Sequence, residues 1–111
     1  MSSKKLIETT DSTYNLRTRV YQLNKLVIIT IYSIDMEPLP VGGMDYELVS
    51  GIPEPFETFT VSLLTNYNGA QNRSNMFNVT ISGNRLYISY VYNFVDQTPN
   101  QIAQQIVYIS K

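Results

Sequence analysis

Apolar and polar residues alternate with a period of two along much of this chain, and that period is typical of half-buried β-strands. Segment 15–24 puts Leu16 and Val20 on one face and Arg17 and Arg19 on the other. The same alternation predicts further strands over residues 44–50, 58–66, 77–81 and 86–91. Val107, Tyr108 and Ile109 favour a strand over 102–110, although Ile102 and Ile106 also fit a helical turn.

Segment 25–34 is apolar at almost every position, so both faces of this strand are expected to be covered. Such a strand fits either the core of a sandwich or a sheet buried under a neighbouring subunit. On this basis we assign Val27, Ile29 and Ile31 to a subunit interface.

Two short turns are expected to join neighbouring strands into hairpins. Gly83-Asn84 separates two alternating runs, and Gly at the first central position suits a type II′ turn. Asn24-Lys25 is a second two-residue turn, although it lacks the favoured Gly. The Gly83 hairpin therefore brings two apolar strand faces side by side as core architecture.

Four stretches rich in Pro, Gly or Asn are expected to be loops, at 35–43, 51–57, 67–75 and 93–101. Residues 1–13 are polar and show no period, which predicts a linker or an N-terminal arm. Residues 14–111 then form one domain of seven or eight strands. This pattern predicts an all-β fold, an antiparallel and jelly-roll-like β-sandwich.

The composition agrees with an all-β domain and excludes several partners. Ala, the best helix former, occurs only at positions 70 and 103, whereas β-branched and aromatic residues are abundant. Eight basic and nine acidic residues leave no basic stripe for nucleic acid. The longest apolar run, at 26–29, is too short for membrane insertion.

The side chains available for chemistry argue against an enzyme. The chain has no His and no Cys, so neither a nucleophilic triad nor a His- or Cys-based metal site is expected. Its carboxylates lie in loops and at strand ends, where solvated charges are common. Asp35 and Glu37 do not follow the pattern of a calcium loop. We expect no catalytic residues, no metal and no cofactor.

Aromatic residues beside amides and charged groups are a common arrangement for saccharide binding. One such place begins at Tyr67 and the other at Tyr92. The candidate ligand-binding residues are Asn66, Tyr67, Asn68, Asn72, Arg73, Tyr92 and Asp96. The alternative interpretation is that the aromatic rings belong to a core or an interface and that the amides are turn residues.

Tyr is unusually frequent, with nine residues and no Trp, and its amphipathic ring suits surfaces that become buried on assembly. Tyr87 and Val91 fall on the strand face opposite Leu86 and Ile88, and that face is half apolar. We therefore add Tyr87 and Val91 to the interface and expect a homo-oligomer, first a cyclic trimer and second a dimer.

The order of these features resembles small C-terminal β-sandwich domains of tail and baseplate proteins from phages of Gram-positive bacteria. "NLRTRVYQLNKLVIITI" is similar to the opening R-x-x-G-N-x-V-x-V-x-I of that family, with Leu23 in place of its Gly. "PLPVGG" and "SGIPEPF" stand where the family has LP-containing loops, and "SGNRLYIS" matches its G-x-L-x-I hairpin. The resemblance covers residues 15–110.

The resemblance implies a trimeric virion module located on the tail or baseplate. Such a module would engage a saccharide of the host cell wall or anchor the receptor-binding protein among other baseplate proteins. The alternative is a free-standing carbohydrate-binding module without catalytic activity.

Overall fold

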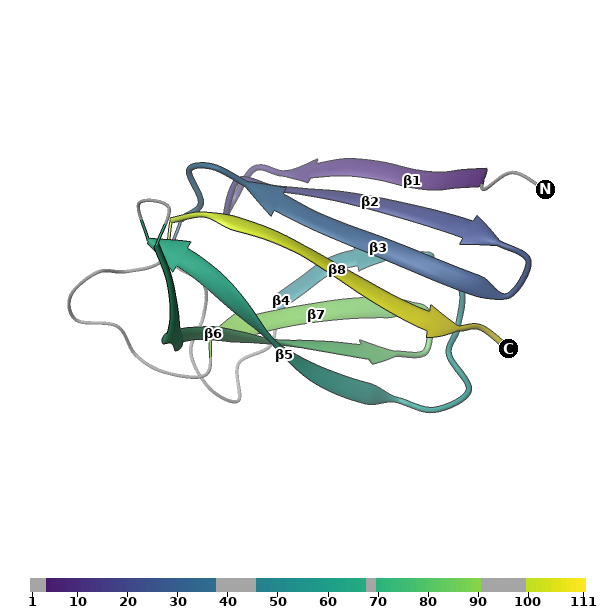
Figure 1. Ribbon diagram of the computed structural model, residues 1–111. Helices are drawn as coiled ribbons and strands as arrows, with labels where there is room; N and C mark the ends of the chain where they lie inside the picture. The colour runs from purple at the N-terminus through teal and green to yellow at the C-terminus, as the bar shows by residue number, and fades with distance from the viewer. Residues whose placement is uncertain (1–3, 38–45, 68–69, 91–99) are drawn as a thin grey trace.

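A computed structural model describes residues 4–37, 46–67, 70–90 and 100–111, with the backbone alone at 66–67, 70–75 and 90. The described residues form eight strands in two four-stranded antiparallel sheets that pack face to face (Figure 1). The predicted antiparallel β-sandwich is confirmed.

Sheet A has the strand order β1-β2-β3-β8. Its strands are β1 (Lys4–Asp11), β2 (Leu16–Leu23), β3 (Leu26–Ser33) and β8 (Ile102–Ile109). The first three strands form a meander, and β8 pairs antiparallel with β3 from the far end of the chain.

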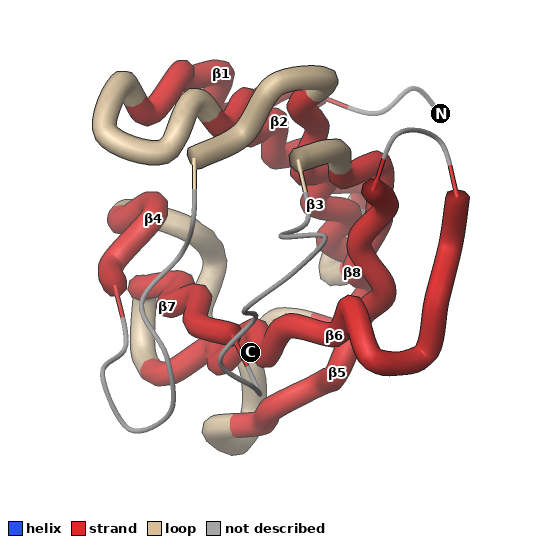
Figure 2. Tube along the Cα trace, turned by 90° about the vertical axis from the view of Figure 1, so that its left-hand side faces the viewer, coloured by secondary structure: helices blue, strands red, loops and turns tan. Residues whose placement is uncertain are grey.

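Sheet B has the strand order β4-β7-β6-β5. Its strands are β4 (Tyr46–Ser50), β5 (Phe59–Tyr67), β6 (Ala70–Ser82) and β7 (Arg85–Tyr90). Three hairpin-connected strands, β5 to β7, return to β4, which is a Greek key read in reverse. Together the two sheets leave β5 close to β8 (Figure 2). Between them the Gln104 side chain donates to the Leu64 carbonyl at 2.9 Å.

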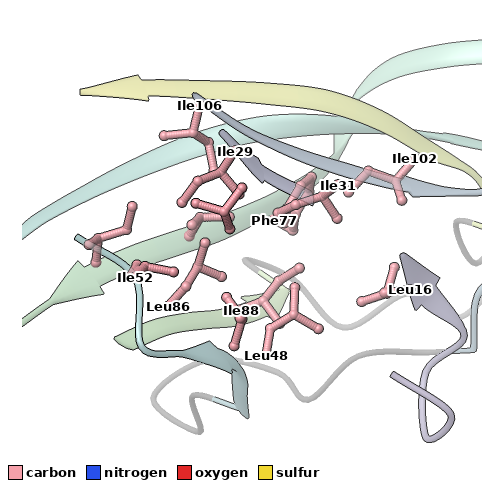
Figure 3. Packing of buried hydrophobic residues seen from close by; sticks show 14 of the residues in the cluster. Leu16, Ile29, Ile31, Leu48, Ile52, Phe77, Leu86, Ile88, Ile102 and Ile106 are labelled. Carbon is pink, nitrogen blue, oxygen red and sulfur yellow. The ribbon is translucent and has the colours of Figure 1, made fainter. Parts of the chain in front are cut away.

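The core lies between the sheets and is almost wholly aliphatic (Figure 3). Each strand contributes alternate residues, because successive side chains on a strand point to opposite faces. Phe77 is the largest fully buried side chain. The other fully buried apolar residues are Leu16, Val20, Val27, Ile29, Ile31, Val79, Ile81, Leu86, Ile88 and Ile102.

Both predicted hairpin turns are present, and each uses a left-handed residue. Gly83 has φ of 58° and lies between the paired residues Ser82 and Arg85. Asn24 has φ of 55° and lies between Leu23 and Leu26. Asn tolerates this conformation better than other side chains, so the missing Gly in the first turn is replaced by the next best residue.

One end of the sandwich is closed by the segment that joins β4 to β5. The Tyr108 hydroxyl donates to the Pro53 carbonyl at 2.6 Å, and the Lys111 amide donates to the Glu54 carbonyl at 2.8 Å. Ile52, within this segment, is buried. Burial raises the pKa of Tyr108 to about 12.

The other end is tied by Asp11, at the end of β1. One carboxylate oxygen accepts the Tyr14 amide at 2.8 Å and the other accepts the Tyr46 hydroxyl at 2.6 Å. The hydrogen bond to Asp11 raises the pKa of Tyr46. The rings of Tyr14 and Tyr46 also meet edge to face, so this end links both sheets.

Two sequence predictions are wrong. Residues 4–11 of the expected arm form β1, whose alternation is hidden because only Ile7 among its inward residues is strongly apolar. Residues 70–75 of the expected loop are the first part of β6, which pairs with β5 through Tyr67–Ala70 and Asn66–Gln71. Polar residues on an extended hairpin carry no apolar period, so the pattern does not reveal such strands.

Candidate functional site

The outer face of sheet A carries the most distinctive surface of the described residues. Strand register places its side chains in rows that run across the sheet from β2 to β3 to β8. One row joins Tyr21, Ile28 and Val107, and the next joins Leu23, Leu26 and Ile109. The rows toward the opposite end start at Arg19 and Arg17.

The first two rows form the apolar half of this face. It consists of Tyr21, Leu23, Leu26, Ile28, Val107 and Ile109. Val107 and Ile109 are each 50% exposed, although large aliphatic side chains usually avoid water. The other four residues are half-buried, and no charged residue lies within these two rows on β2, β3 or β8. The first row ends at Lys5 on β1, the partner of Tyr21.

The opposite half of the face holds a shallow groove, which we name the Arg–Tyr groove. Its depression of about 190 Å³ is lined by Arg17, Arg19, Thr30 and Tyr32. A second depression of about 180 Å³ adjoins it and shares Arg17 and Tyr32. Tyr32 is 48% exposed, because its neighbour across the sheet on β8 is the small residue Ala103.

Charges around the Arg–Tyr groove are unevenly paired. Glu8 accepts a hydrogen bond from Lys5 at 2.6 Å, and Lys5 and Arg19 together lower the pKa of the Glu8 carboxyl. Arg19 Nε is 3.5 Å from Glu8 and makes no hydrogen bond within the described part of the chain. Arg17 has no carboxylate within 4 Å among the described residues.

The second depression is bordered by a fixed turn. Asn15 adopts φ of 58°, and its side-chain amide donates to the Asp35 carbonyl at 2.8 Å. This contact holds the exit of β3 beside the start of β2. The exposed Ile34 therefore lies at the rim next to Tyr32.

The outer face of sheet B is different in kind. Hydroxyl and amide side chains bond to one another across β5 and β6, through Thr58–Ser82, Thr60–Thr80 and Ser62–Asn78. Arg85 and Glu47 form an ion pair at 2.8 Å on the neighbouring strands. Tyr87 lies on this polar face, as the alternation with the buried Leu86 and Ile88 predicts.

The predicted interface on β3 is wrong in its choice of face. Val27, Ile29 and Ile31 are completely buried in the core of the single chain, so they cannot reach a partner. The strand is apolar on both faces as predicted, but the outward residues are Leu26 and Ile28. A run that is apolar at every position does not show which of its residues face the core. Only the register of β3 with β2 and β8 decides this.

The predicted saccharide residues divide into two groups. Asn66 and Tyr67 lie at the end of β5, and Asn72 and Arg73 lie in the first part of β6, so one hairpin carries all four. Asn68 and the second group, Tyr92 and Asp96, lie outside the described residues, as does the interface residue Val91.

Sequence reasoning missed the Arg–Tyr groove. The available signal was the pair Arg17 and Arg19, two residues apart on one face of a predicted strand. Tyr32 gave no such signal, because only the pairing of β2 with β3 sets it opposite Arg17.

The described residues offer no group of three acidic, His or Cys side chains that could hold a metal ion. They also contain no helix that is long and apolar enough to cross a membrane.

Comparisons with protein-family models, with curated proteins and with solved structures gave no significant match to this chain.

Proposed function

We propose that this chain is a non-catalytic structural module of a phage tail or baseplate, and that it assembles into a homo-oligomer through the apolar half of sheet A. The observation that carries this proposal is the continuous apolar surface centred on Ile28. The virion role rests on the sequence resemblance to tail and baseplate domains.

The apolar half has the character of a surface that is buried in use. Two exposed apolar side chains, Val107 and Ile109, adjoin four half-buried ones, and this grouping differs from the scattered exposed residues of an ordinary monomer. At about 25 cal/mol per Å² of apolar area removed from water, covering such a surface favours association substantially.

A second copy of the chain is the partner that we propose for this surface. The chain has eight basic and nine acidic residues, so its copies do not repel one another strongly. Cyclic symmetry would bring the apolar half of each copy together at one axis. The proposed state is a trimer, located in the virion, with other baseplate proteins as further partners.

The test is the oligomeric mass of matched variants, measured by light scattering during size-exclusion chromatography. Wild type should run at three times the chain mass of 12.7 kDa. Ile28→Lys places a charge at the centre of the apolar half and should give single subunits. Thr80→Lys makes the matched change on the central strand β6 of sheet B and should leave the trimer intact.

A wild-type protein that runs as one subunit at all concentrations would refute assembly through this face. A stable dimer that Ile28→Lys dissociates would keep the face and correct the symmetry. The virion role is tested separately. Antibodies against the chain should label the tail end of particles that carry it in electron micrographs.

A second candidate function is saccharide binding by a free-standing module. The observation that favours it is that Asn66, Tyr67, Asn72 and Arg73 all lie on the β5–β6 hairpin, close in sequence to its turn. A glycan array should then show binding that Tyr67→Ala removes, while single subunits remain active. Binding that survives in Tyr67→Ala would exclude this hairpin as the site.

A further inference from the structure

We propose that the Arg–Tyr groove on the outer face of sheet A binds the phosphate group of a phosphorylated saccharide. This site goes beyond the assembly function proposed above and does not depend on it. It lies at the end of sheet A opposite the apolar half, where the rows begin at Arg17 and Arg19.

Strand geometry sets the two guanidinium groups around one small volume. Arg17 and Arg19 are two residues apart on β2 and point to the same face, which separates their Cα atoms by roughly 7 Å. Their cross-strand partners are Tyr32 and Thr30, which complete the lining of the depression of about 190 Å³. Long side chains from these positions converge on a ligand placed between them.

A tetrahedral oxyanion fits this arrangement better than a carboxylate does. A single guanidinium fork satisfies both oxygens of a planar carboxylate. A phosphate presents further oxygens, which the second guanidinium and the Thr30 hydroxyl can reach from another side.

The charge balance around the groove also favours an anion. Lys5, Arg17 and Arg19 carry three positive charges, and Glu8 carries one negative charge among them. Glu8 takes its hydrogen bond from Lys5, and Arg17 has no ion-pair partner within the described residues. A ligand phosphate would supply the missing counter-charge.

Tyr32 gives the groove a surface for the sugar. Its ring is 48% exposed beside Arg17. Its partner on β8, Ala103, has a small side chain that does not cover the ring. The apolar face of a sugar ring packs on an exposed aromatic ring, while its hydroxyls remain in water. Nucleic acid is disfavoured as the phosphate source, because the chain offers no basic track beyond this cluster.

The experiment is a titration of the whole protein, followed through its backbone amide resonances. The probes are inorganic phosphate, glucose 1-phosphate and glucose. Glucose 1-phosphate should shift resonances of Arg17, Arg19, Thr30 and Tyr32 in a saturable way, and glucose should not. The same spectra show whether each variant is folded.

Variants separate a built site from general charge attraction. Arg17→Gln should weaken binding of glucose 1-phosphate about tenfold or more, because a charge-assisted pair is lost. Arg17→Lys should weaken it less. Arg85→Gln removes the same charge from sheet B and should leave affinity within about twofold, since the site is elsewhere.

The outcomes decide each part of the proposal. Equal weakening in Arg17→Gln and Arg85→Gln, or no saturable shift, would overturn the site. Tyr32→Ala should weaken glucose 1-phosphate but not inorganic phosphate. Equal affinity of wild type for these two probes would overturn the sugar contact. Tighter binding of a single-stranded oligonucleotide than of glucose 1-phosphate would overturn the saccharide assignment. The oligomeric mass is unaffected in each case, so failure here is distinct from failure of assembly.

Discussion

The two sheets have the same four-stranded antiparallel architecture, but the side chains on their outer faces differ in polarity. On sheet B, the Thr60–Thr80 and Ser62–Asn78 pairs satisfy one another's polar groups across the strands. On sheet A, the equivalent central positions hold Ile28 and Val107, with two arginines at the far end. The difference indicates that the outer face of sheet B is suited to contact with water, whereas the outer face of sheet A is suited to contact with another molecule.

The largest expected change in stability distinguishes the inward from the outward side of β3 in sheet A. Ile29→Ala should lower the free energy of unfolding by about 3–4 kcal/mol, because it opens a cavity in a closely packed core. Ile28→Ala, one residue earlier, should cost about 1 kcal/mol or less at dilutions where the chain is dissociated. Urea denaturation of both variants measures this contrast, and equal losses would contradict the assigned strand parity.

The next largest change in stability is expected from substitutions in the hairpin turns of the two sheets. Gly83→Val should destabilise the fold by about 1–3 kcal/mol, since a β-branched residue resists φ of 58°. A Cβ there meets no atom within 4 Å, so the cost comes from the backbone alone. Gly83→Asn is the matched control and should cost less, as Asn24 already serves in the corresponding turn of sheet A. Thermal unfolding of the two variants tests the order.

A smaller effect concerns the bond that ties β8 of sheet A to the segment leading into sheet B. Tyr108→Phe removes the hydrogen bond to the Pro53 carbonyl and should cost about 1 kcal/mol at neutral pH. Tyr32→Phe, on the solvent side of sheet A, is the control and should change stability little.

The same residue predicts an alkaline weakening. The pKa of Tyr108 is about 12 in the fold and about 10 in the unfolded chain, so the fold retains a proton that the unfolded chain releases. Its contribution to stability is complete below pH 10 and is lost as pH rises from 10 to 12. Denaturation between these pH values should show a steeper decline for wild type than for Tyr108→Phe.

The smallest expected change in stability tests the polar ladder of sheet B directly. Replacing Thr60 and Thr80 together by Val should alter the free energy of unfolding by about 0.5 kcal/mol or less, because both are surface residues. The variant should nevertheless self-associate through its newly apolar face, as we propose for sheet A. Sedimentation velocity measures this association, and its absence would mean that apolar surface alone does not explain assembly.

The fold was predictable where one face of a strand is apolar and the other is polar. That condition holds for β5, the later part of β6 and β7, and in part for β2; together with the turn residues it predicted the sandwich class and both hairpins. It fails for β1 and the first part of β6, which are polar on both faces. Pairing with a neighbouring strand, rather than their own pattern, makes these segments extended.

The candidate site was only half predictable, for a related reason. The excess of apolar strand surface was visible in the sequence. Its location depends on which residues of each strand face outward. The sequence therefore named Ile29 where the outward-facing residue is Ile28. The Arg–Tyr groove needs the register of β2 against β3 and the small residue Ala103 on β8, and neither is a local property.

The order of strands in sheet A carries a consequence for how the molecule is made. Residues 26–33 must wait for residues 102–109, which are synthesised much later, before one flank of β3 is paired. Until then an apolar strand edge stands open, and closing so long a loop is slow. We expect nascent chains that stall before β8 to need chaperone protection, and chains cut short at residue 101 to aggregate.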